Sequence, residues 1–182
     1  LFTGWIPLDD IEARERADHA PYRDWIRAGF LRGCEGDVID YEDVIDTIMQ
    51  AAKDYDLRIV GFDPWLSTTI TQRLMSLIAG AGRPTQIVEI PQSMKSISPP
   101  MKEMEHLIRT HEMLHVHNTA ARQCFANVQC VTDDNENIKP TKKRSRGRID
   151  ITVSWIIAFA ASKLAAGPSI NEKVQAEDWS LC

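Results

Sequence analysis

The chain has 182 residues, of which 43% are hydrophobic and 26% charged, with a formal net charge of −5. These values are typical of one globular domain that buries roughly 70% of its unfolded surface, and they exclude a disordered or fibrous chain. The longest apolar stretch, residues 149–166, is interrupted by charged and hydroxyl side chains, so no membrane span is predicted. The four cysteines form no C-x-x-C pair, which indicates reduced thiols in a cytoplasmic setting.

The first part of the chain predicts short elements. Residues 1–7 form a strand-like run without an initiator methionine, which suggests that a longer protein continues upstream. Residues 9–16 and 21–28 are expected to form short polar helices, the second with proline at a permitted first-turn position. Short strands or turns are expected over residues 29–33 and 36–39.

The middle of the chain alternates helix and strand patterns. Apolar residues at helical spacing predict a helix over residues 41–52. The apolar run 57–62 predicts a central strand buried on both faces, and a second helix is expected to end near residue 80. Residues 85–90 predict another strand and 99–110 an amphipathic helix. This alternation predicts a layered α/β sheet.

The last part of the chain contains a hairpin pattern and a long apolar helix. Residues 114–116 are expected to form a short strand, 120–128 a helix, and 131–142 a β-hairpin with an acidic turn. Residues 149–164 carry apolar side chains on several faces, which predicts a largely buried helix. A polar, frayed tail is expected after residue 167.

Two aspartates lie at the ends of apolar segments. Asp63 follows the run 57–62 and should emerge at the carboxyl edge of a sheet, where α/β proteins bind ligands, while Asp150 opens the last helix. Because Mg²⁺ and Mn²⁺ prefer oxygen ligands, the pair indicates part of a divalent-metal site that needs a further ligand. Alternatively, Asp63 is a turn or cap residue and Asp150 simply favours a helix N-terminus.

A basic segment, residues 138–148, lies between the hairpin and Asp150 of this acidic chain. Its six cations are Lys139, Lys142, Lys143, Arg144, Arg146 and Arg148. Cations in this pattern favour contact with nucleic-acid phosphates, which would make binding salt-dependent without reading base sequence. A solvated loop is the alternative interpretation.

Residues 111–115 match the H-E-x-x-H pattern, in which two histidines on one helix face bind zinc and the glutamate is a general base. His111, Glu112 and His115 would form this zinc-protease site. The predicted helix ends near His111, however, and strand-like alternation after it would destroy the ligand spacing. No glycine-rich nucleotide loop and no G-x-S-x-G motif occur.

Short motifs recur in a definite order along nearly the whole chain. They are Trp5-Ile6-Pro7, Pro21 to Trp25 with Gly29, Gly61 to Trp65, Gln92-Ser93-Met94, Asn127, Ile138-Lys139-Pro140 with Lys142, and Arg148-Ile149-Asp150. Their order and spacing resemble the C-terminal nuclease domain of tailed-phage large terminase subunits, in the branch that includes the HK97-like terminases.

The resemblance implies an RNase H-like fold, in which a mixed sheet flanked by helices holds acidic residues around two Mg²⁺ or Mn²⁺ ions. Such domains cut both strands of concatemeric viral DNA. Asp63 matches the second metal ligand of the family and Asp150 the third, while the strand that carries the first aspartate is not found. We therefore expect residues 1–167 to be a nuclease domain that lacks its first strands, and residues 168–182 to be a polar tail.

Three functions follow as hypotheses. The first is a metal-dependent endonuclease in the host cytoplasm with double-stranded DNA as substrate and, by resemblance, a small terminase subunit and a portal protein as partners. The second is a non-catalytic DNA-binding or assembly remnant, since one ligand is missing. The third is the zinc protease. Unpaired strand edges would also favour a homo-oligomer.

Overall fold

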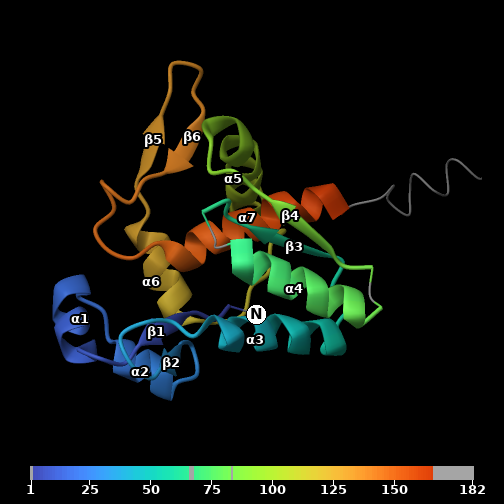
Figure 1. Cartoon of the computed structure of the whole chain (residues 1–182). Helices are drawn as coiled ribbons and strands as arrows, with labels where there is room; N and C mark the ends of the chain where they lie inside the picture. Colours follow the sequence, from blue (N-terminus) through green and yellow to red (C-terminus); the bar gives the residue numbers. More distant parts are fainter. Residues whose placement is uncertain (1, 66–67, 83, 166–182) are drawn as a thin grey trace, which may run out of the picture.

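The structure is a computed structural model that describes residues 2–65, 68–82 and 84–165 (Figure 1). The predicted tail, 168–182, lies outside the described residues. The elements, in chain order, are β1 (Trp5–Pro7), α1 (Ile11–Asp18), α2 (Tyr22–Arg27), β2 (Arg32–Cys34), α3 (Tyr41–Asp54), β3 (Ile59–Phe62), α4 (Thr68–Gly80), β4 (Gln86–Glu89), α5 (Met94–Arg109), α6 (Thr119–Asn127), β5 (Cys130–Thr132), β6 (Ile138–Pro140) and α7 (Asp150–Ala165).

Within the described residues, the strands form three separate pairs. β1 pairs with β2 and β3 with β4, both in parallel, whereas β5 and β6 form an antiparallel hairpin. Both strand directions of the expected mixed sheet are present, but the pairs do not join into one continuous sheet there. Among the described residues β3 pairs with β4 alone, and its four residues are half-buried rather than fully buried as predicted.

Helix α7 occupies the centre of the molecule, as its apolar composition predicts. Its residues Val153, Ile156, Ile157 and Ala161 form one core cluster with side chains from α5 and from the end of β4. α7 approaches β3 closely at Gly61, where an added Cβ would lie 2.8 Å from the Cβ of Ala161. The absence of a side chain at Gly61 therefore allows the helix to lie on the strand.

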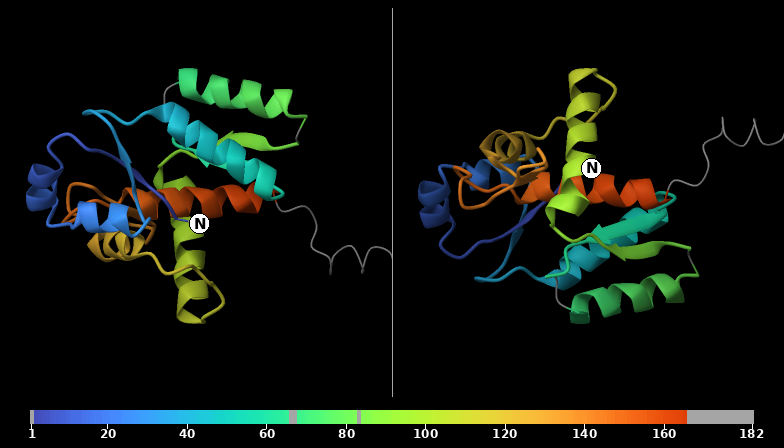
Figure 2. Two further views of the ribbon diagram at one scale, coloured as in Figure 1. Left: turned by 90° about the horizontal axis from the view of Figure 1, so that it is seen from below. Right: turned by 90° about the horizontal axis from the view of Figure 1, so that it is seen from above.

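The β3–β4 pair is covered by helices on both faces. Figure 2 shows α3 and α4 on one side of the pair and α7 on the other. Val60 of β3 packs with the α3–α4 cluster, whereas its neighbour Ile59 packs with the α7 cluster. This alternation follows from the two-residue period of a strand and gives the layered α/β arrangement that the sequence predicts.

Residues 2–39 form an N-terminal lobe, coloured blue in Figure 1. Its core consists of Tyr22, Trp25 and Leu31, and it packs against Ala120 of α6. α6 in turn contacts α7, so the lobe reaches the centre of the molecule through α6. The short helices predicted in this region are confirmed, with bounds shifted by one or two residues.

Two predictions about element positions are wrong. α5 begins at Met94 rather than near residue 99, because the Ser93 hydroxyl accepts a hydrogen bond from the Ser96 amide at 3.1 Å and Ile97 is buried. The expected strand 114–116 is a loop, since α5 ends at Arg109 and His111 adopts a left-handed φ of 60°. None of the described helices combines the length and apolar character needed to cross a membrane.

Candidate functional site: two aspartates at one cavity

Asp63 lies directly after β3, at the carboxyl end of the β3–β4 pair. Its Oδ1 accepts a hydrogen bond from the backbone amide of Trp65 at 3.1 Å. This contact is typical of an aspartate in a turn, so the alternative interpretation of Asp63 describes part of its environment. Each carboxylate oxygen can accept a second partner, so this contact leaves Asp63 able to bind a cation.

Gln92 also belongs to this site, although its motif, Gln92-Ser93-Met94, did not predict a role for it. Its Nε2 donates a hydrogen bond to Oδ2 of Asp63. Gln92 follows β4, and the carboxyl ends of parallel strands meet at one edge of a sheet. The spacing of Asp63 and Gln92 after two neighbouring strands was therefore the signal that could have paired them.

Asp150 is the first residue of α7 and lines one cavity together with Asp63. Its Oδ1 accepts a hydrogen bond from Nζ of Lys142 at 2.6 Å, and both side chains are more than half exposed. An ion pair this exposed contributes little to stability. Lys142 is thus an exposed counter-charge beside the carboxylate rather than a buried structural partner.

The cavity that Asp63 and Asp150 share has a volume of about 410 Å³ and lies between α3, α4, β3 and α7. Gln92 and Lys142 also line it. Two carboxylates at one cavity fit a hard divalent ion, because Mg²⁺ commonly binds one or two carboxylates together with waters and substrate phosphates. In the described part of the chain, no three or more His, Cys, Asp or Glu side chains are arranged so that they could hold a metal ion.

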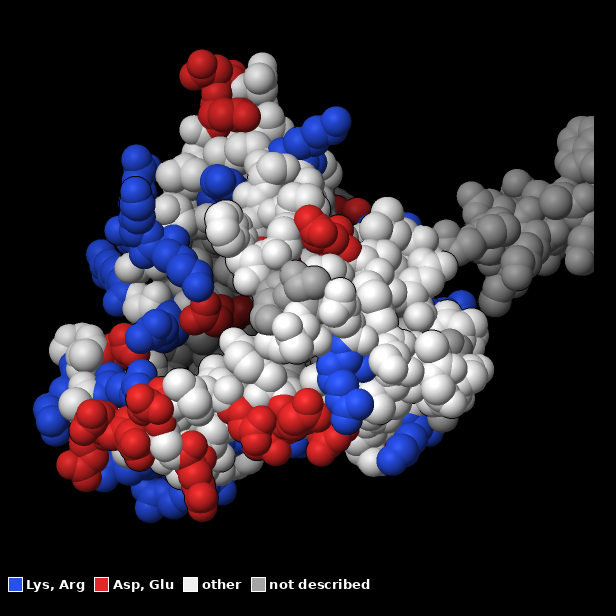
Figure 3. All heavy atoms as spheres, in the orientation of Figure 1, with Lys and Arg blue, Asp and Glu red and all other residues white. Residues whose placement is uncertain are grey.

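The basic segment forms β6 and the loop before α7. Thr141 and Ser145 tether this loop: the Ser145 hydroxyl donates to the Thr141 carbonyl at 2.8 Å and accepts from the Gln129 amide at 3.2 Å. Figure 3 shows Lys and Arg side chains gathered on the side of the molecule where this loop lies. Lys142, Lys143, Arg144 and Arg146 are exposed, and Lys139 on β6 is half-buried.

Arg148 differs from the other five cations. Its Nε donates to Oδ2 of Asp18 at 3.0 Å, and its carbonyl accepts from Nδ2 of Asn127 at 3.1 Å. The hydrogen bond with Asp18 raises the pKa of Arg148. The Arg148 side chain is 61% exposed, but its guanidinium is paired with Asp18, so its contact with DNA phosphates stays a prediction.

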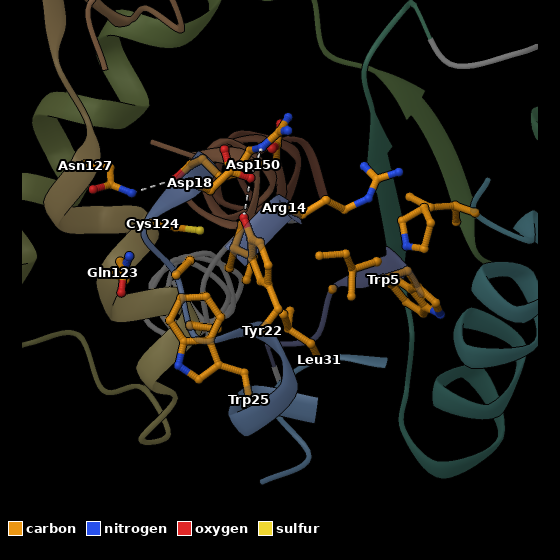
Figure 4. A pocket seen from close by; sticks show the side chains of 18 of the residues that line it. Trp5, Arg14, Asp18, Tyr22, Trp25, Leu31, Gln123, Cys124, Asn127 and Asp150 are labelled. Atoms are coloured by element: carbon orange, nitrogen blue, oxygen red, sulfur yellow. Dashed lines mark hydrogen bonds and ion pairs between the residues drawn. The ribbon is translucent and has the colours of Figure 1, made fainter. Parts of the chain in front are cut away.

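A second cavity of about 510 Å³ adjoins the first, because Asp150 lines both. Its wall includes Trp5, Tyr22 and Trp25, with Asp18 and Asn127 beside Asp150 (Figure 4). Burial and a hydrogen bond to Asp18 raise the pKa of Tyr22 well above its ordinary value. The phenol therefore remains a hydrogen-bond donor at neutral pH.

The H-E-x-x-H residues lack the helical geometry that the zinc-protease alternative requires. His111 is in a turn, and Glu112 and His115 lie in the following loop rather than on a helix face. His115 instead packs its ring against Phe2 and Trp155. Without helical geometry the two histidines lose the spacing that zinc binding requires.

Comparison with known proteins places the chain in a family. The family model for the endonuclease domain of the terminase large subunit matches residues 3–165. The terminase large subunit of Enterobacteria phage HK97 is 29% identical over 158 residues, which cover 87% of this chain and 31% of that protein. The protein YmfN of Escherichia coli K12 is 25% identical over 166 residues, which cover 88% and 35% respectively.

Solved structures give the same result. The crystal structure of the HK97 bacteriophage large terminase matches with a TM-score of 0.74 and 29% identity, covering 86% of this chain and 32% of that one. The large terminase nuclease from thermophilic phage G20c matches in fold, with a TM-score of 0.52 and 16% identity over 69% of this chain and 64% of that one. The predicted RNase H-like fold is thereby confirmed, and the chain belongs to the terminase large subunit endonuclease-domain family.

Proposed function

We propose that this chain is a DNA-cleaving domain that hydrolyses phosphodiester bonds of concatemeric viral DNA with Mg²⁺ or Mn²⁺. The observation that carries the proposal is the cavity lined by Asp63, Asp150 and Lys142. Membership of the nuclease family supports it. The chain spans about a third of the length of the curated relatives that it matches.

The wider setting is part of the same proposal. Residues 1–167 form the nuclease domain and residues 168–182 its polar tail. The packaging partners are a small terminase subunit and a portal protein, and the site of action is the host cytoplasm. The open edges of the two-stranded pairs favour a homo-oligomer.

Asp63 and Asp150 are the residues that hold the divalent ion. When bound, the ion supplies an activated water and stabilises the charge that develops on the phosphate. Gln92 keeps the Asp63 carboxylate turned toward the cavity through its hydrogen bond to Oδ2. In the absence of an ion, Lys142 neutralises the charge of Asp150. When the ion is bound, the Lys142 ammonium group is free to hold a phosphate beside the same carboxylate.

The exposed cations Lys143, Arg144 and Arg146 bind the DNA backbone next to the cavity, and Lys139 extends this surface onto the hairpin. Contacts of this kind position a duplex without selecting its sequence. Each phosphate that they neutralise releases counterions, so binding weakens steeply as salt rises. The proposed substrate is accordingly double-stranded DNA of no fixed sequence.

The test is nicking of supercoiled plasmid in Mn²⁺ by the wild-type chain and by Asp63→Ala and Asp150→Ala. The proposal predicts nicking by the wild type and at least a hundredfold less by either variant, as expected when a ligand of a catalytic ion is removed. Asp134→Ala, which removes an exposed carboxylate at the hairpin tip, is the matched control and should nick normally. Equal nicking by all four proteins would refute the proposal.

A second candidate function is a DNA-binding module that does not cut. The observation that favours it is the number of carboxylates at the cavity. The described residues place two there, whereas the family resemblance implies three. This candidate predicts salt-sensitive DNA binding with no Mn²⁺-dependent nicking by the wild type. The same plasmid experiment, paired with a binding titration, therefore separates the two functions.

A further inference from the structure

The residues that precede Asp150 are fixed from three directions. The Arg148 side chain is bound by Asp18 of the N-terminal lobe, and the Arg148 carbonyl is bound by Asn127 at the end of α6. Ile149 is 2% exposed in the central core, and its carbonyl accepts a hydrogen bond from the Val153 amide at 3.0 Å. The start of α7, and with it Asp150, is thus anchored by lobe, helix and core together.

Asp18 is the enclosed member of its ion pair. Its side chain is 19% exposed, compared with 61% for Arg148. The same Oδ2 also accepts a hydrogen bond from the Tyr22 hydroxyl at 2.7 Å, and Tyr22 is itself buried in the lobe. The chain of contacts from Tyr22 through Asp18 to Arg148 therefore begins in a packed core and ends two residues before Asp150.

Asn127 makes its contact because residue 147 has no side chain. A Cβ at Gly147 would lie 2.7 Å from Nδ2 of Asn127, the atom that donates to the Arg148 carbonyl. The Asn127 side chain thus lies in close contact with the backbone of residues 147 and 148. This close approach fixes the main chain independently of the Arg148 side chain.

We infer that Asp18, Tyr22, Asn127 and Arg148 are positioning residues that hold the Asp150 carboxylate at the cavity shared with Asp63. The inference rests on the proposed function, in which Asp150 is an ion ligand. Arg148 then acts on Asp150 rather than on DNA, unlike the five other cations of the basic segment. When the anchor is removed, ion binding must also order residues 147–149, so the affinity for the ion falls.

The test is a double-mutant cycle on Mn²⁺ affinity, measured by electron paramagnetic resonance with Asp18→Asn, Arg148→Gln and the combined variant. We expect each single variant to weaken Mn²⁺ binding about tenfold, and the combined variant to be no weaker than the worse single one. Arg27→Gln, which breaks an exposed ion pair in the same lobe, is the control and should bind Mn²⁺ normally. Wild-type affinity in Asp18→Asn would overturn the inference.

A second measurement distinguishes positioning from DNA contact. The salt dependence of DNA binding should be unchanged in Arg148→Gln, whereas Lys143→Gln should lower the slope of log K against log salt by about 1. An equal fall in both variants would make Arg148 a DNA contact and overturn the inference. If Asp18→Asn does not fold, Tyr22→Phe is the milder variant, with an expected loss of Mn²⁺ affinity of about threefold.

Asp150→Ala separates the inference from the function on which it rests. If this variant loses Mn²⁺ binding while Asp18→Asn retains it, the proposed function stands and the positioning role fails. If Asp150→Ala binds Mn²⁺ as the wild type does, the proposed function fails and the positioning role fails with it.

Discussion

Asp63 and Asp150 reach one cavity from two differently built sides of the molecule. Asp63 follows a strand that lies between helices, and its partners Trp65 and Gln92 come from the segments that follow β3 and β4. Asp150 begins a helix whose preceding residues are held by segments distant in the sequence. The Asp63 side therefore depends on packing between α7 and β3, and the Asp150 side on polar contacts that cross the molecule.

The difference shows how one cavity can combine close packing and exposure. The Asp63 side is closely packed, because α7 and the α3–α4 pair cover β3 from its two faces. The Asp150 side adjoins a loop whose cations are exposed to solvent, and three anchors separate that loop from the helix start. The loop can then adapt to a duplex without moving the carboxylate.

The largest expected effect comes from breaking the Asp63 side with Gly61→Val. The new Cβ would lie 2.8 Å from the Ala161 Cβ and 3.2 Å from the Ile157 carbonyl, and backbone cannot move away cheaply. We expect the free energy of unfolding to fall by about 1–3 kcal/mol or more, with loss of Mn²⁺ binding. Urea denaturation measures the first quantity.

Gly80→Ala is the matched control for this substitution, because nothing lies within 4 Å of a Cβ added at the end of α4. It should leave stability equal or raise it by about 0.5–1 kcal/mol. Similar losses of stability in both variants would contradict the close α7–β3 packing.

The next largest effect concerns the loop on the Asp150 side. Replacing Lys143, Arg144 and Arg146 together by glutamine should lower the salt slope of DNA binding by roughly 3, about 1 for each residue. Mn²⁺ affinity and the unfolding midpoint should stay unchanged, because these exposed side chains hold neither the loop nor Asp150. An unaltered salt slope would place the DNA on another face.

The two sides of the cavity also differ in how far the sequence predicts them. The hairpin, the helix over residues 41–52 and the central last helix were predicted correctly, because each has a complete local pattern. Asp63 and Asp150 could be singled out because each ends or opens such a pattern. Asp63 was expected at the carboxyl edge of a sheet and Asp150 at the start of the last helix, and both line one cavity in the structure.

The anchors of Asp150 could not be predicted, because they join residues far apart. Asp18 and Arg148 are 130 positions apart, and no periodicity links them. The strand expected at 114–116 failed for a related reason: its alternating residues have no partner strand, and Leu114 is 94% exposed. Alternation predicts a strand only where a neighbouring strand and a core are available.

Lys142→Met tests the counter-charge of Asp150. Because the Lys142–Asp150 pair is exposed, removing the ammonium group should raise Mn²⁺ affinity by no more than about fivefold, while DNA binding weakens. Isothermal titration with MnCl₂ measures the first change and a filter-binding titration the second. A fall in Mn²⁺ affinity would mean that Lys142 organises the site rather than competing for it.

The smallest effect is the acid sensitivity of the Asp18 anchor. Burial alone raises the pKa of Asp18, but hydrogen bonds from Tyr22 and Arg148 outweigh it and hold the pKa below the ordinary 3.8. Asp18 therefore stabilises the fold above about pH 4, and this contribution is lost as pH falls through its lowered pKa. The thermal midpoints of wild type and Asp18→Asn should converge as pH falls below about 4; a constant gap would show that the carboxylate charge is unimportant.

The central claim is that Asp63 and Asp150, which line one cavity, bind one divalent ion together. Its most direct test is Mn²⁺ binding to the wild type, Asp63→Ala and Asp150→Ala, followed by electron paramagnetic resonance. We predict that the wild type binds Mn²⁺ and that each variant loses the same binding event. Undiminished binding in either variant would show that its aspartate is no ligand, and the account of a shared site would be wrong.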